Sequence, residues 1–234
     1  MMRSRQVRKG PLLEPPQQME DWDFETADTQ YMTHGLHPYP ARMIPQIARR
    51  LIVRYSRPGS ETVVLDPFMG SGGVLVEASL KLPWEKGPAQ FGARRSIGID
   101  INPLALLLAR AKTTPIDPVS LQAKAERLLA KVRDGFIAYG TGKLRVSPPY
   151  FFNIDFWFRP RVKHELQILR ENINALADDD MRIFFKACFS KTVREASNTR
   201  SREFKLFRIP KRELARHEPD VYDIFRANVE KGLR

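Results

Sequence analysis

The chain has 234 residues, with 39 Lys and Arg against 27 Asp and Glu, and a formal net charge of +12 at pH 7. Its one cysteine, Cys188, excludes an internal disulfide and a cysteine zinc site, as is typical of a reducing compartment. No apolar stretch approaches the roughly 20 residues that span a bilayer, and a signal-peptide core is lacking, so we expect a cytoplasmic protein. The charge favours a polyanionic partner such as nucleic acid, although a generally basic protein shares this composition.

The first part of the chain changes character along its length. Residues 1–30 begin basic, pass through PPQQ and become acidic, which predicts a loosely ordered arm, more typical of a solvated tail than of a DNA-binding arm. Residues 45–54 predict a helix, and the turn at 56–59 leads into the first strand.

Residues 63–73, VVLDPFMGSGG, join an apolar strand to a helix through a glycine-rich turn. The predicted strand covers 61–66, and the predicted helix begins near Val74. Glycines at such a turn let the backbone approach a ligand and point its amides at it. The turn lacks the GK[ST] ending of a phosphate-binding loop and the GxGxxG spacing of dinucleotide folds.

A second predicted strand, residues 96–100, ends in another carboxylate, Asp100. Parallel strands joined by one helix end on the same edge of the sheet, so Asp66 and Asp100 should face one ligand. An ionised acid accepts two hydrogen bonds and suits the hydroxyls of a ribose. Asp66 disfavours a pyrophosphate beside the glycines and favours a cationic sulfonium. The alternative is that both acids cap helices in an ordinary α/β unit.

The remainder of the chain has helical periodicity. Residues 103–112 predict a helix rich in Leu and Ala, and Asp117 followed by proline predicts the start of another, with an apolar face that ends before Gly135. Further helices are predicted after Pro160 and after the acidic residues 178–180. Their apolar stripes are more typical of a core than of a cofactor site.

Three blocks together resemble the amino-directed DNA methyltransferases that use S-adenosylmethionine: HPYPAR at 37–42, DPFMGSG at 66–72 and GIDINPLA at 98–105. In that family the glycine block contacts the methionine part of the cofactor, the acid of the third block holds the ribose, and the HxYPA block closes the pocket. The resemblance implies S-adenosylmethionine as cofactor and no metal. The implied cofactor-binding residues are His37, Tyr39, Pro40, Asp66, Phe68, Gly70, Ser71, Gly72, Asp100 and Asn102.

Such enzymes must localise the lone pair of an exocyclic amine on adenine or cytosine, and the family does so with a [DNS]-PP-[YFW] tetrapeptide. The chain offers Ser147, Pro148, Pro149 and Tyr150 as catalytic candidates. A working motif should end a buried parallel strand, whereas the preceding residues are half basic and residues 143–147 predict only a weak strand. Residues 152–158 resemble a linker block that one subgroup carries before its true catalytic tetrapeptide. The tetrapeptide is therefore either the catalytic motif or, as we prefer, a chance match.

The family fold resembles a seven-stranded, mostly parallel sheet, yet only two strands are clearly predicted here. We therefore expect an α/β fold with a Rossmann-like class I methyltransferase sheet, incomplete, and a helical insert. The expected division is a flexible arm at 1–30, an S-adenosylmethionine-binding α/β region at 31–116, and a helical insert at 117–234 that could contact DNA. We expect the N-terminal portion of a truncated or split enzyme, with a second chain as a candidate source of the catalytic half.

The basic, aromatic segment 191–212 is the expected site of phosphate contact, with Arg200 and Arg202 among its cations and Ser197 and Asn198 as further donors. The alternative is a solvated charged face beside a core helix. Two other functions are compatible with the sequence. One is methylation of RNA, as in tRNA guanine methyltransferases, and the other is a non-catalytic cofactor-binding subunit.

Overall fold

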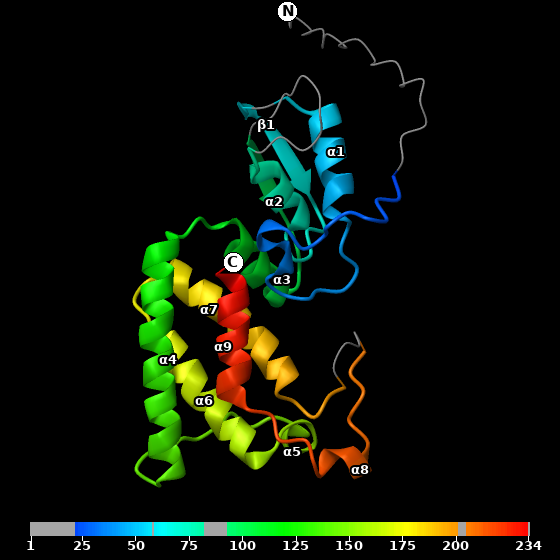
Figure 1. The fold of residues 1–234 in the computed structure, drawn as a ribbon. Helices are drawn as coiled ribbons and strands as arrows, with labels where there is room; N and C mark the ends of the chain where they lie inside the picture. The colour runs from blue at the N-terminus through cyan, green and yellow to red at the C-terminus, as the bar shows by residue number, and fades with distance from the viewer. Residues whose placement is uncertain (1–21, 58, 82–92, 201–204, 234) are drawn as a thin grey trace, which may run out of the picture.

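The computed structural model describes residues 22–57, 59–81, 93–200 and 205–233, so most of the expected arm at 1–30 lies outside the described residues. In chain order the elements are η1 (Met32–Gly35), α1 (Pro45–Tyr55), β1 (Gly59–Asp66), α2 (Gly73–Ser79), β2 (Arg94–Gly98), α3 (Pro103–Thr113), α4 (Pro118–Gly140), α5 (Ile154–Trp157), α6 (Pro160–Asn174), α7 (Asp179–Glu195), α8 (Lys211–Leu214) and α9 (Val221–Gly232). Figure 1 shows β1, α1 and α2 gathered at one end of the molecule and α4, α6, α7 and α9 at the other.

The sheet of the described chain has two strands, β1 and β2, which pair in parallel. Leu65 lies opposite Ile97, and Asp66 lies opposite Gly98. Both predicted strands are thus confirmed, although the second ends at Gly98, two residues before its acid. The expected α/β class with an incomplete sheet is confirmed.

The weak strand predicted at 143–147 is wrong. These residues form no strand in the structure, and Lys143 and Arg145 are exposed. Leu144 and Val146 alternate with the exposed Lys143 and Arg145, but the segment lies between α4 and α5 and pairs with neither of the described strands.

One face of the sheet is covered and the other is open among the described residues. Helix α2 packs against both strands and against α1. On the opposite face Val63, Leu65 and Ile97 remain 44%, 59% and 51% exposed. Strands of a parallel sheet normally bury both faces. These three residues define an apolar face of the sheet. A further layer of polypeptide that buried this face would stabilise the sheet.

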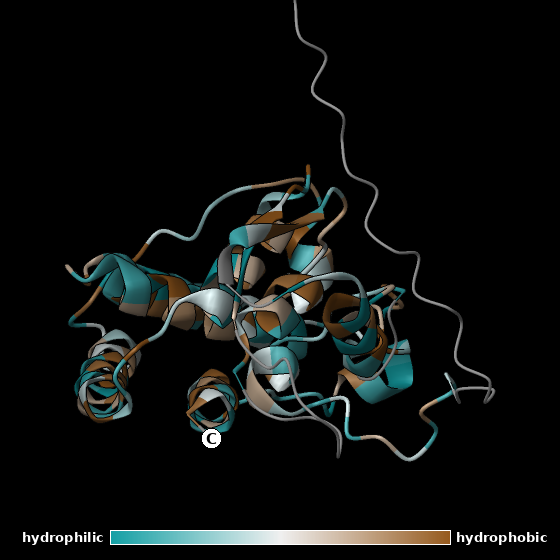
Figure 2. Cartoon of the chain, turned by 90° about the horizontal axis from the view of Figure 1, so that it is seen from above, coloured by the Kyte–Doolittle hydropathy of each residue, from teal (hydrophilic) through white to brown (hydrophobic). Residues whose placement is uncertain are grey.

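Helices α4, α6, α7 and α9 pack around a shared apolar core that includes Leu128, Leu169, Phe185 and Phe225. The helix that ends at C in Figure 2 carries both hydrophobic and hydrophilic residues, as expected of a helix with one buried face. None of the helices within the described ranges is long and apolar enough to cross a bilayer.

The predicted N-cap at Asp117 is confirmed, whereas the helix predicted after residues 178–180 begins among them, at Asp179. The Asp117 carboxylate accepts a hydrogen bond from the Ser120 amide at 2.8 Å, and that of Asp178 accepts one from the Met181 amide at 2.9 Å. Helix α4 continues past Gly135, where its predicted apolar face ends, to Gly140. A Cβ at Gly135 would stand 2.8 Å from Ile168 Cγ2, so this glycine serves the close approach of α6 rather than helix termination.

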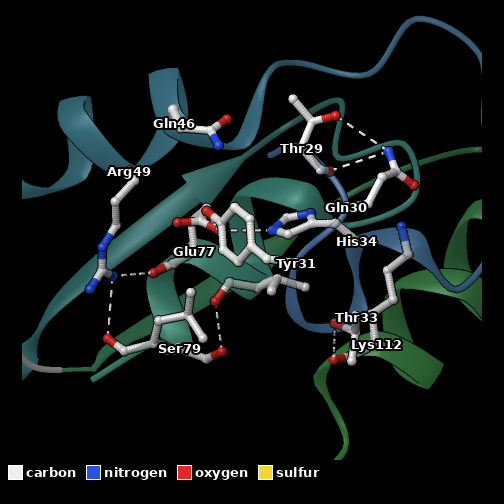
Figure 3. Close-up of polar contacts among 12 residues, drawn as sticks. Thr29, Gln30, Tyr31, Thr33, His34, Gln46, Arg49, Glu77, Ser79 and Lys112 are labelled. Carbon is white, nitrogen blue, oxygen red and sulfur yellow. Dashed lines mark hydrogen bonds and ion pairs between the residues drawn. The ribbon is translucent and has the colours of Figure 1, made fainter. Parts of the chain in front are cut away.

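A buried polar cluster ties the N-terminal residues to α2 (Figure 3). The fully buried Glu77 carboxylate accepts hydrogen bonds from the Tyr31 hydroxyl at 2.6 Å and lies 2.7 Å from His34 Nε2. Arg49 Nη1 donates to the Glu77 carbonyl oxygen at 2.7 Å. Burial and the Glu77 carboxylate raise the pKa of Tyr31. These contacts fix the segment that leads into residues 37–42.

Replacing Glu77 by leucine should therefore destabilise the fold. His34 and the Tyr31 hydroxyl would lose their buried acceptor, and such losses cost about 3 kcal/mol. Urea unfolding of Glu77→Leu should show this decrease in the free energy of unfolding. Glu126→Leu, at an exposed position of α4, is the matched control and should change stability by less than about 0.5 kcal/mol. Equal effects of the two substitutions would contradict the account.

Candidate cofactor site

The parallel pairing of β1 and β2 brings the two strand-end loops together. The Ile99 amide donates to the Asp66 carbonyl oxygen at 2.9 Å, and the Met69 amide donates to the Ile99 carbonyl oxygen at 3.0 Å. The backbone of each loop is thus bonded to the other. The expectation that Asp66 and Asp100 lie on one edge of the sheet agrees with this geometry.

The Asp100 carboxylate organises both loops. Its Oδ2 accepts the Gly70 amide hydrogen at 2.9 Å, and its Oδ1 accepts that of Asn102 at 2.8 Å. Each oxygen of an ionised carboxylate can accept a further hydrogen bond, so capacity remains for ligand hydroxyls. The N-cap residues of α2 and α3 are Gly72 and Asn102. Neither Asp66 nor Asp100 caps a helix, so the alternative that both acids are helix caps is wrong.

The glycines of the turn are required by conformation and by space. Gly70 and Gly72 have positive φ values of +51° and +79°. A Cβ at Gly72 would stand 2.7 Å from the Cβ of Ala109, so α3 packs directly against this glycine. The turn therefore holds its shape between β1 and α3.

Ser71 points into the protein rather than toward the strand ends. Its buried hydroxyl accepts a hydrogen bond from Lys112 Nζ at 2.9 Å, and Thr33 donates to the Lys112 carbonyl oxygen at 3.0 Å. Burial, with the nearby Arg42 guanidinium, lowers the pKa of Lys112 to about 8. Lys112 was missed in the sequence, where the only available signal is a lysine within a Leu- and Ala-rich helix.

Tyr39 and Asn102 connect the upstream block to the strand ends. Asn102 Nδ2 donates to the Tyr39 hydroxyl oxygen at 3.2 Å, and a Cβ at Gly70 would stand 3.3 Å from Tyr39 Cε1. Pro40 is exposed beside them. The structure thus brings Tyr39, Gly70, Asp100 and Asn102 into one connected group.

His37 lies deeper and joins this group to α7. Its Nδ1 lies 2.6 Å from the Pro38 carbonyl oxygen, which can only accept, and its Nε2 lies 3.2 Å from the Ser190 hydroxyl. Burial, together with Lys112, Lys191 and Arg194, lowers the pKa of His37 to about 4. The imidazole is therefore neutral at pH 7, and Ser190 is a partner that the sequence did not reveal.

Ser147, Pro148, Pro149 and Tyr150 lie elsewhere. They form an irregular segment between α4 and α5, where Tyr150 is 92% exposed. Figure 1 shows this segment at the end of the helical region away from β1, and α4 alone, with 23 residues, is about 35 Å long. The structure does not bring the tetrapeptide to the strand ends.

The parallel βαβ unit, its glycine turn and its strand-end carboxylates are consistent with a Rossmann-like α/β fold of methyltransferase type. Residues 36–119 match the family model described as "RMKL-like, methyltransferase domain". The chain is 41% identical over 204 residues to the Type II methyltransferase M.MvaI of Kocuria varians, an alignment that covers 86% of this chain and 42% of that protein.

A second relative is the Type II methyltransferase M.MjaII of Methanocaldococcus jannaschii, 32% identical over 120 residues, with 49% of this chain and 20% of that protein covered. The chain therefore spans less than half the length of these curated relatives. No solved structure gives a significant match. The expected resemblance to site-specific DNA methyltransferases is confirmed, and S-adenosylmethionine is the methyl donor that such a domain implies.

The depressed pKa of His37 predicts an acid-sensitive fold. The folded pKa of about 4 lies below the ordinary 6.5, so the unfolded state binds more protons between these values. The stabilisation is full above about pH 6.5 and is lost as the pH falls toward 4. Between pH 7 and 4.5 the wild type should lose about 2 kcal/mol more than His37→Gln in urea unfolding. Parallel pH profiles for the two proteins would contradict the buried, neutral imidazole.

Proposed function

We propose that residues 31–116 bind S-adenosylmethionine and that the protein methylates an exocyclic amino group of adenine or cytosine in DNA. The observation that carries the proposal is the connected group in which Asp100 accepts from Gly70 and Asn102, and Asn102 donates to Tyr39. This group stands at the strand edge where the glycine turn and both carboxylates meet. A cytoplasmic location is consistent with this function.

The residues at this edge fit the proposed cofactor. Asp100 retains acceptor capacity for ribose hydroxyls, and Asp66 supplies negative charge near a sulfonium. Phe68 and Ile101 are 88% and 99% exposed beside the carboxylates, and they offer apolar surface to an adenine ring. Ser71 would contribute through its backbone, because Lys112 holds its hydroxyl.

Bound S-adenosylmethionine supplies an electrophilic methyl group, and the protein must present the amine with its lone pair localised. The segment between α4 and α5 lies at the end of the helical region away from β1, which supports the chance-match interpretation of residues 147–150. We propose that the catalytic tetrapeptide comes from polypeptide outside these 234 residues. That polypeptide, whether from the same protein or from a second chain, would also cover the apolar face of Val63, Leu65 and Ile97.

Calorimetric titration of the chain with S-adenosylmethionine tests the proposed site. The wild type should bind one equivalent, and Asp100→Ala should weaken binding at least tenfold, because it removes the ribose acceptor and releases the Gly70 amide. Asp134→Ala, at an exposed acid of α4, is the matched control and should bind as the wild type does.

Urea unfolding should show that Asp100→Ala remains folded. Binding that is unchanged in folded Asp100→Ala, or absent from the wild type, would refute the proposed site.

A further inference from the structure

A groove of about 900 Å³ separates the upstream block from the C-terminal half of α7. Tyr39 and Asn102 line one wall, and Trp157, Lys191 and Arg200 line the other. Its volume lies at the upper end of the range for small-ligand sites, so it has room for a short stretch of extended polymer. The residues that line the groove do not include the glycine turn at residues 70–73.

The groove nevertheless opens beside the cofactor edge. Tyr39 and Asn102 belong to both, since they are bonded to each other and Tyr39 lies against Gly70. His37, which also lines the groove, is held by Ser190 of α7. A strand that occupied the groove would therefore run directly past the proposed methyl donor.

The lining is electropositive. Lys191, Arg194 and Arg200 contribute three cations, and the carboxylate of the lining is that of Glu195. Glu195 Oε1 lies 3.9 Å from Lys191 Nζ, while its Oε2 accepts from Asn228 Nδ2 at 2.8 Å. The Lys191 side chain is only 13% exposed, and burial lowers its pKa. An anion in the groove would compensate this desolvated ammonium.

Aromatic side chains accompany the cations. Trp157, Phe158 and Tyr39 line the groove and are partly buried. Basic grooves with aromatic side chains are typical of single-stranded nucleic acid sites, where bases stack on the rings and cations follow the phosphates.

The expected donors Ser197 and Asn198 are not available to phosphates, because both side chains are buried. Ser197 Oγ donates to the Arg194 carbonyl oxygen at 2.7 Å, and Asn198 Nδ2 donates to the Phe156 carbonyl oxygen at 3.1 Å.

We propose that this groove holds unpaired nucleotides of the DNA strand that carries the target base, with Lys191 and Arg200 at phosphates and Trp157 against a base. This inference rests on the proposed function, because it places the DNA strand beside the proposed cofactor. The ligand chemistry is that of an extended single strand, which matches the separation of a target base from its duplex.

Fluorescence anisotropy with a labelled 12-nucleotide single-stranded DNA, at several salt concentrations, tests the groove. The double variant Lys191→Gln/Arg200→Ala should bind about tenfold more weakly and reduce the slope of log affinity against log salt by about 1.4. Arg127→Ala/Lys131→Ala, on the surface of α4 and outside the lining, removes the same charge and should retain the wild-type slope. Trp157→Ala should weaken binding about tenfold without altering the slope.

Wild-type affinity and slope in the double variant would overturn the proposal, as would an equal loss in the α4 control. Tighter binding of a matched RNA strand than of DNA would overturn the choice of DNA. Arg200→Ala alone, at an exposed position, should give about half the slope change and tests the groove even if the double variant fails to fold.

Calorimetry with S-adenosylmethionine on the same proteins separates the two proposals. If the double variant still binds the cofactor and its DNA binding is unaltered, the proposed function is supported and the proposed role of the groove is contradicted. If the wild type does not bind the cofactor but its DNA binding depends on Lys191 and Arg200, the role of the groove is supported and the proposed cofactor site is contradicted.

Discussion

The carboxylate of Asp100 is the constraint on which the cofactor edge depends, because it accepts hydrogen bonds from Gly70 in one loop and Asn102 in the other. Without it the two loops would be joined only through the backbone bonds of Ile99. The hydrogen bond from the Gly70 amide and the packing of Gly72 on Ala109 hold the turn in its conformation. The site is therefore preorganised by the β1–β2 pair, and a ligand would not need to order it.

The helical region joins this edge through a continuous apolar core, to which Leu108 of α3 contributes, and through specific polar contacts. His37 reaches Ser190 of α7, and on the surface Arg110 of α3 pairs with Asp179 at the start of α7. The buried pair of His34 and Glu77 fixes the segment that carries His37. Tyr39 and Asn102 belong both to the cofactor edge and to the lining of the groove, so the two sites have a wall in common. Cofactor and strand would thus be held by one rigid group of residues.

Local signals predicted much of this molecule, and long-range contacts account for what was missed. The glycine turn, both strands and the cap at Asp117 follow from residues a few positions apart. The packing of Gly135 against Ile168 and the inward turn of Ser71 toward Lys112 involve distant partners that no local pattern reveals. The SPPY match was local too, and its surroundings place it away from the strand ends.

Hydrogen–deuterium exchange with and without saturating S-adenosylmethionine tests most directly whether the strand-end loops form the cofactor site. The account predicts slower exchange of the amides in residues 67–73 and 99–104, with exchange in α4 and α6 unchanged. Protection confined to the helical region, or no protection at a concentration that saturates binding, would contradict it.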